Sequence, residues 1–183
     1  MSGKLDAKRA ALVVVDVQEG FRPAIPGFDR IAAATATMVR GAAAMDVPIV
    51  VTEQYPKGLG PTVPEVAEHL PDGVEPLAKT VFSAASADGF ALGGREQAIV
   101  CGIEAHVCVN QTVLELLDGG LEVHVVTDAV GSRSPADREL GIAKAERAGA
   151  WPTSVETALF ELLGKAGDDR FKQVQGLVLE YAP

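Results

Sequence analysis

The stretch IVCGIEAHVCVNQT, residues 99–112, begins as an apolar run typical of a buried strand and ends with the residue spacing of a helix. Other valine-rich runs, bounded by Gly or Pro, recur along the chain, and segments with helical spacing lie between them. Helical connections between strands that are buried on both faces predict parallel pairing, so we expect an open, doubly wound α/β sheet of about six parallel strands with helices on both faces. The expected strands are 11–17, 48–52, 75–82, 97–103, 121–129 and 150–154, the expected helices are 28–45, 106–117, 136–148 and 155–163, and residues 54–73 are expected to form a long functional loop.

The composition limits the class of protein. The 183 residues, 48% of them apolar, suffice for one core, so residues 1–183 are expected to form a single domain. The formal charge of −9 repels nucleic acid phosphates and anionic membrane surfaces, which argues against both as partners. No apolar run in the sequence approaches the roughly 20 residues of a membrane span. Cys101 and Cys108 make a poor disulfide framework and suit a reducing compartment, so the expected location is the cytoplasm.

Three polar residues occur where a sheet of this kind binds ligands, which is beyond the carboxyl ends of its strands. Asp16 follows the run LVVV, Lys79 lies late in EPLAKTVF, and Cys108 lies in the first turn of the helix after QAIVCGI, so all three are expected in one crevice. The helix N-terminus is expected to stabilise a Cys108 thiolate and to lower its pKa well below about 8.5. Asp16 is then placed to accept the thiol proton, and Lys79 to keep that carboxylate ionised.

Each of these residues also has a purely structural interpretation. Cys108 alone is compatible with inert core packing, Asp16 with a turn or cap, and Lys79 with a solvated side chain. The alternative class is a non-catalytic nucleotide- or partner-binding module. This sequence lacks the phosphate cradle of such a module, because no G-x-G-x-x-G follows the first strand and no G-x-x-x-x-G-K occurs. Structural roles are expected for Cys101 in the core, His124 facing a helix, Asp128 as a cap before Gly131, and Trp151 in packing.

Three motifs follow one another along the chain. VVDVQEGF contains D-x-Q-x-x-F at Asp16, Gln18 and Phe21, AKTVFSA contains Lys79 followed by Ser-Ala, and CGIEAHVCV contains G-x-x-x-x-x-C-V at Gly102, Cys108 and Val109. In this order the motifs resemble those of the isochorismatase-like cysteine hydrolases, over about Ala11 to Phe160. The loop TEQYPKGLGPTVPEV, residues 52–66, further resembles the branch named isochorismatase domain-containing proteins.

This resemblance implies a Rossmann-like three-layer sandwich with a six-stranded parallel sheet, usually assembled as a dimer or larger homo-oligomer. It implies a catalytic triad of Asp16, Lys79 and Cys108. It also implies a cis peptide bond between Ile103 and Glu104, which places the backbone amides of Glu104 and Cys108 as an oxyanion hole. Many relatives carry threonine at the position of Ala105, so its absence raises the question of what supports this turn.

The expected function is hydrolysis of a small molecule, by cleavage of a C–N bond of an amide or imide through a Cys108 thioester. A vinyl-ether hydrolase of the isochorismatase type is the alternative enzyme, because that reaction needs no cysteine nucleophile. Nicotinamidases of the superfamily hold a metal through an Asp-x-His pair, but Glu53 and Gln54 stand in that region here, so no metal and no other cofactor are expected. The expected wall residues of the substrate pocket are Phe21, Gln54, Tyr55 and His106, the last of which is also typical of a surface helix.

Overall fold

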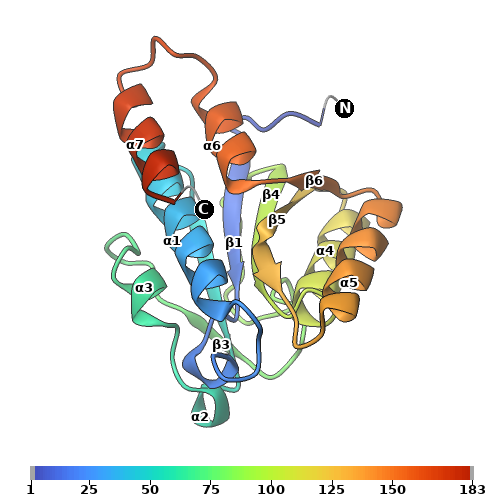
Figure 1. Ribbon diagram of the computed structural model, residues 1–183. Helices are drawn as coiled ribbons and strands as arrows, with labels where there is room; N and C mark the ends of the chain where they lie inside the picture. Colours follow the sequence, from blue (N-terminus) through green and yellow to red (C-terminus); the bar gives the residue numbers. More distant parts are fainter. Residues whose placement is uncertain (1–2, 182–183) are drawn as a thin grey trace.

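A six-stranded parallel sheet forms the centre of the structure, for which a computed structural model describes residues 3–181. The strands are β1 (Ala10–Val15), β2 (Ile49–Gln54), β3 (Leu77–Lys79), β4 (Gln97–Ile103), β5 (Glu122–Gly131) and β6 (Trp151–Thr153). They pair in the order β3-β2-β1-β4-β5-β6 (Figure 1). The prediction of a doubly wound α/β fold with about six parallel strands is confirmed.

Alternate residues of the central strands point to opposite faces of the sheet and build two cores. Leu12 and Val14 of β1 belong to the first core, and Val13 and Val15 belong to the second. The helices over the first face are α1 (Phe28–Ala44) and α6 (Val155–Leu163), and α7 (Phe171–Tyr181) packs against both. The helices over the second face are α4 (Cys108–Asp118) and α5 (Pro135–Ala148) (Figure 1). Burial on both sides explains why the strands read as continuous apolar runs.

The helix ends follow local signals in the sequence. Pro135 begins α5, where its missing N–H is not needed, and Gly149 ends the helix with φ +113°. Ser154 caps α6, because its hydroxyl accepts a 3.2 Å hydrogen bond from the backbone N–H of Thr157. The predicted helix 155–163 therefore coincides with α6, and the predicted helix 28–45 ends at Ala44.

The structure differs from the prediction mainly between residues 54 and 82. The strand predicted over 75–82 is limited to β3, because the chain bends after Lys79 and turns the carbonyls of Val81 and Phe82 toward the Lys79 side chain. The predicted loop 54–73 contains two single-turn helices, and a proline begins each of them. These helices are α2 (Pro56–Leu59) and α3 (Pro64–Ala67). Two helices elsewhere in the chain were also not predicted, α7 and the short 3-10 helix η1 (Glu19–Phe21). The helix expected from residue 106 begins at Cys108.

Strands β1 and β4 approach closely at the point where the strand order reverses. Gly102 of β4 has φ +121°, and a Cβ added there would overlap the backbone of Val15 in β1. Only glycine combines this backbone conformation with the required space. The glycine of the third motif therefore keeps these two strands paired beside the position of Asp16.

We expect Gly102→Ala to lower the free energy of unfolding by about 3 kcal/mol, because the new Cβ meets backbone that cannot move aside. Gly94→Ala is the matched control. Gly94 also has a positive φ, +76°, but nothing lies near its Cβ position. Its substitution should cost only about 1 kcal/mol. Urea denaturation followed by circular dichroism measures both values, and equal costs would contradict the argument from close approach.

Candidate active site

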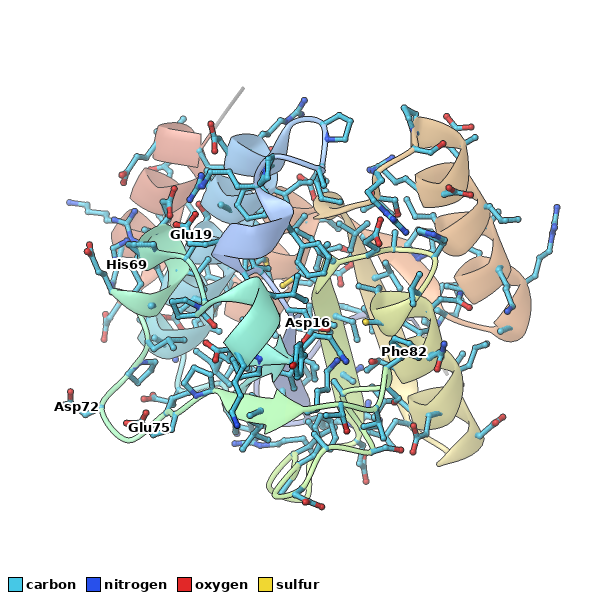
Figure 2. The ribbon with its side chains drawn as sticks, turned by 90° about the horizontal axis from the view of Figure 1, so that it is seen from below. Asp16, Glu19, His69, Asp72, Glu75 and Phe82 are labelled. Carbon is cyan, nitrogen blue, oxygen red and sulfur yellow. The ribbon has the colours of Figure 1, made fainter. Side chains whose placement is uncertain are left out.

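The three residues predicted to form the site lie at the carboxyl-end edge of the sheet. Asp16 follows β1, Lys79 is the last residue of β3, and Cys108 is the first residue of α4, after β4. In a view toward this edge, Asp16 lies near the centre of the molecule, whereas Asp72 and Glu75 lie at its periphery (Figure 2). Doubly wound sheets bind ligands at this edge, where the strand order reverses between β1 and β4.

A buried ion pair joins the first two of these residues. Lys79 Nζ lies 2.7 Å from Asp16 Oδ2, and both side chains are 0% exposed. The other carboxylate oxygen, Oδ1, accepts a 2.7 Å hydrogen bond from Thr52 Oγ1 of β2. Asp16 also has a left-handed backbone conformation, with φ +53°, which is uncommon outside glycine. An isolated buried charge is strongly unfavourable, so each of the two charged groups makes the burial of the other possible.

The ammonium group of Lys79 has three further acceptors. It donates to Gln54 Oε1 at 2.6 Å and to the carbonyl oxygens of Phe82 and Val81 at 3.0 and 3.3 Å. These contacts fix the ion pair relative to β2 and to the turn after β3. Sequence reasoning missed Thr52, whose signal is a polar residue inside an apolar strand, and it missed the two carbonyls, for which the sequence carries no signal.

Cys108 lies beside this ion pair and is a neutral thiol at rest. The residue is only 4% exposed, and burial raises the pKa of its thiol to about 12. The charge of Asp16 and its interaction with the thiol raise the pKa as well, while Lys79 lowers it. The predicted lowering of this pKa at the helix N-terminus is therefore wrong, because the desolvation of the thiolate outweighs it. The result is a protonated thiol facing a carboxylate that can accept its proton.

The loop between β4 and α4 presents two amide donors. The peptide bond between Ile103 and Glu104 is cis. Across residues 3–181, no protein acceptor receives a hydrogen bond from the backbone N–H of Glu104 or of Cys108. Both residues are buried, and buried amides are nearly always paired. These two N–H groups are therefore available to a ligand.

The segment from Gly131 to Gly141 holds this loop in place. The backbone N–H of Ala105 donates to Gly131 O at 2.7 Å. The Glu104 carboxylate accepts hydrogen bonds from the backbone N–H and the Nε of Arg133, at 2.9 and 3.0 Å. Gly141 of α5 leaves room for the backbone of Ala105, which an added Cβ would overlap. Backbone and side-chain contacts from this segment thus support the turn at Ala105.

The four predicted wall residues lie in different surroundings. Gln54 binds Lys79, and Tyr55 lines a cavity of about 400 Å³ next to Lys79. Phe21 packs against the first core, and His106 Nδ1 lies 3.0 Å from a serine hydroxyl just after β5. The structure therefore brings Gln54 and Tyr55 to the Lys79 side of the site, whereas Phe21 and His106 contact the core and the end of β5.

Gln18, the second residue of the D-x-Q-x-x-F motif, connects the end of β1 to the loop after β2. Its Nε2 donates to the carbonyls of Gly60 and Gln54 at 2.7 and 3.1 Å, and its Oε1 accepts a 2.7 Å hydrogen bond from the backbone N–H of Gln54. The side chain is fully buried. Gln18 therefore positions the start of the loop that carries Tyr55.

The residues expected to have structural roles lie away from the ion pair. Cys101 is buried in the first core. Asp128 Oδ1 accepts a 3.0 Å hydrogen bond from the first amide of α6, so this residue caps α6 and not the segment before Gly131. His124 is buried, with Nε2 3.3 Å from Glu122 Oε1.

Among the described residues, no three His, Cys, Asp or Glu side chains are grouped to hold a metal ion. Over the same 3–181 range, none of the helices combines the length and the apolar character needed to cross a bilayer.

Comparison with known sequences gives extensive matches. The isochorismatase domain model matches residues 10–157. Isochorismatase domain-containing protein 2 of Pongo abelii is 43% identical over 184 residues, which cover 99% of this chain and 88% of the relative. The secreted isochorismatase effector Isc1 of Phytophthora sojae is 39% identical, over 98% of this chain and 89% of the relative.

Solved structures agree with these matches. MAR1 ribonuclease from Caenorhabditis elegans has a TM-score of 0.93 at 40% identity, covering 98% of this chain and 94% of that one. YcaC from Pseudomonas aeruginosa, solved with hexane-2,5-diol and covalent acrylamide, has a TM-score of 0.87 at 28% identity, covering 100% and 95%. The YcaC gene product of Escherichia coli, described as an octameric hydrolase of unknown specificity, has a TM-score of 0.88 at 25% identity, covering 98% and 91%. Agreement of the domain model, the relatives and the fold over most of the chain shows that this protein belongs to the isochorismatase family.

Proposed function

We propose that the protein is a cysteine hydrolase that cleaves a C–N bond of a small amide or imide, with Asp16, Lys79 and Cys108 as its catalytic triad. The observation that carries this proposal is the buried Asp16–Lys79 ion pair beside a buried, protonated thiol. Perturbed titratable groups cluster at functional sites, and a buried ion pair by itself adds little stability. A small molecule is the proposed substrate because the cavity at the end of β3 has a volume of about 400 Å³. Lys79 is among its lining residues, and Asp16 and Cys108 are not.

In the first half of the reaction, the Cys108 sulfur attacks the amide carbonyl carbon while Asp16 takes the thiol proton. The pKa of Cys108, raised to about 12, means that proton transfer accompanies the attack and does not precede it. The oxygen that becomes negative would be stabilised by the N–H groups of Glu104 and Cys108, which donate to no other acceptor in the described part of the chain. Lys79 holds the carboxylate in position and stabilises its charge before the proton moves.

In the second half, the tetrahedral intermediate collapses. The C–N bond breaks, Asp16 gives its proton to the leaving nitrogen, and a thioester remains on Cys108. A water molecule then attacks the thioester carbonyl as it loses a proton to Asp16. The C–S bond breaks, the acid leaves, and Asp16 returns the proton to the sulfur. The cycle consumes one water molecule for each bond cleaved and needs no oxidant or reductant.

Other activities predict different roles for the same residues. Vinyl-ether cleavage of the isochorismatase type would use Asp16 as an acid and leave Cys108 without a covalent role. Ribonuclease activity is a second candidate because the C. elegans neighbour, at 40% identity, is described as a ribonuclease. The formal charge of −9 disfavours a polyanionic substrate. A non-catalytic binding module would not require the thiol at all.

We also propose that the chain assembles as a homo-oligomer and works in the cytoplasm. The E. coli neighbour is described as octameric, and Leu140 and Leu179 are large apolar side chains exposed on α5 and α7. A cytoplasmic location would keep the Cys108 thiol reduced. The relative from P. sojae is described as secreted.

We expect a screen of small amides, imides, enol ethers and RNA to detect cleavage of amides or imides. Cys108→Ala should lower kcat/KM at least about a thousandfold, because it removes the nucleophile. Cys101→Ala is the matched control, since Cys101 is a buried cysteine of the first core. The Cys101→Ala protein should keep its turnover. Amine release measures the amide reaction. Cleavage of an enol ether or RNA that survives Cys108→Ala but is lost in Asp16→Asn would refute the thioester mechanism.

We expect no thiolate at Cys108 between about pH 6 and pH 9, because its pKa is raised to about 12 and the acid form dominates below that value. The ultraviolet absorbance of the thiolate, taken as the difference between the native protein and Cys108→Ala across this pH range, is the measurement. A thiolate that appears below pH 8 would show that Cys108 is activated at rest, contrary to the proposed coupling of proton transfer to attack.

We expect Lys79→Met to lower the free energy of unfolding by about 3 kcal/mol, because it leaves the Asp16 carboxylate buried without its partner. Asp16→Asn should also destabilise the protein, and the double variant should cost at least about 1 kcal/mol less than the sum of the two. The exposed pair Arg40–Glu180, with 3.1 Å between its atoms, is the control and should show coupling close to zero. Additive costs at Asp16 and Lys79 in urea denaturation would contradict a strong ion pair.

A further inference from the structure

Thr112 is a buried polar residue on the face of α4 that carries Cys108. It lies four residues after Cys108, which places the two side chains on the same side of the helix. Its hydroxyl donates a 2.7 Å hydrogen bond to Cys108 O and accepts a 2.8 Å hydrogen bond from the backbone N–H of Ala84. The residue is 0% exposed. A threonine hydroxyl often binds the carbonyl one turn back, so the informative partner is the second one, which comes from another part of the chain.

Ala84 belongs to the segment that holds Lys79 in place. Two carbonyls of this segment, one of them that of Phe82, accept hydrogen bonds from Lys79 Nζ, and only Ser83 separates Phe82 from Ala84. Ala84 is fully buried in the second core, which also contains Cys108. Ser83 and Ala84 are the Ser-Ala of the second sequence motif. This motif therefore connects the lysine to the helix of the cysteine.

The sheet alone gives Lys79 and Cys108 only an indirect connection. Lys79 ends the edge strand β3, Cys108 follows β4, and β2 and β1 lie between these strands. The strand β3 contains only three residues. A lysine ammonium group on its flexible stem is also poorly fixed by its own backbone. The hydrogen bonds of Thr112 provide a direct connection, because they join the Cys108 carbonyl to the segment whose Phe82 carbonyl holds the ammonium group.

A second contact joins the same segment to α4, but it is exposed. Ser86 Oγ donates to Glu115 Oε1 at 2.7 Å. Water can replace either partner of an exposed hydrogen bond, so its loss costs little. The N–H of Ala84 has no such substitute, because a buried amide that loses its acceptor stays unpaired. The exposed contact therefore serves as a control for the buried one.

We infer that Thr112 is a positioning residue, whose hydroxyl sets the place of the Lys79 ammonium group relative to the Cys108 sulfur. It acts through Ala84 and Phe82. Without the hydroxyl, the segment would shift to find another acceptor for the Ala84 N–H, and the ammonium group would shift with it. The effect on turnover rests on the proposed function, whereas the reactivity of the thiol can be measured without a substrate.

The test is the rate at which iodoacetamide alkylates Cys108, measured in the Cys101→Ala protein so that a single cysteine reacts. Burial raises the pKa of the Cys108 thiol and Lys79 opposes this effect, so displacement of the ammonium group should leave less thiolate. Thr112→Val, which keeps the shape of the side chain but lacks the hydroxyl, should slow alkylation at least about threefold. The Thr112→Ser protein should react at the native rate. Glu115→Ala, which removes only the exposed contact, should also leave the rate unchanged.

A second background separates positioning from a general loosening of the packing. In Lys79→Met, the further change Thr112→Val should alter the alkylation rate by less than about 1.5-fold, because the group through which Thr112 acts is gone. A loosened segment would instead expose Cys108 and raise the rate in both backgrounds. If Lys79→Met does not fold, the contrast of Thr112→Val with Thr112→Ser and Glu115→Ala decides. Thr112→Ala replaces Thr112→Val if the valine variant does not fold.

Three outcomes would overturn the inference: alkylation of Thr112→Val at the native rate or faster, an equal slowing in Thr112→Ser or Glu115→Ala, or the same slowing with and without the Lys79 ammonium group. Turnover is read separately, with acetamide and succinimide as probes. Thr112→Val should lower kcat about tenfold and leave KM within about twofold, because the reacting groups are misplaced while the probe still binds. A native protein that cleaves neither probe, with the alkylation rates as expected, would leave the positioning role standing and count against the proposed function.

Discussion

The buried ion pair between Asp16 and Lys79 is the interaction on which the site depends. It joins the carboxyl ends of β1 and β3, which are not neighbours in the sheet, because β2 lies between them. Thr52 of the intervening strand binds the same carboxylate. Neither charge is tolerable in this position alone, so the pair forms only when all three strands are in register. The geometry of the site is thus a direct consequence of the sheet topology.

The protonated state of Cys108 follows from the same burial. Exclusion of water disfavours the thiolate more than the helix N-terminus and Lys79 favour it, so the resting sulfur is a thiol with a raised pKa. A thiol in this state is a poor target for oxidants, which react with thiolates. In the proposed mechanism it becomes nucleophilic only when a bound carbonyl can accept the electron pair and Asp16 can accept the proton. An alanine or valine would pack at this position but could perform neither step.

Three glycines allow close approaches that determine the shape of the site. Gly102 admits the backbone of β1, and Gly141 admits the backbone of Ala105 in the loop between β4 and α4. Gly58 admits the ring of Tyr55 after the end of β2. Family membership accounts for the fold.

The sequence by itself determined the fold class, because valine-rich runs separated by helical segments can bury their apolar surface only in a layered parallel sheet. It also indicated Asp16, Lys79 and Cys108, since polar residues at strand ends stand out against apolar runs. Only the tertiary structure decided the raised pKa of Cys108 and the acceptors around Lys79. Desolvation is the sum of many packing contacts, and every residue carries the same backbone carbonyl, so neither property leaves a local pattern in the sequence. The helix α7 was missed for a related reason: its apolar face is buried against α1 and α6, and this packing leaves no local pattern in the sequence.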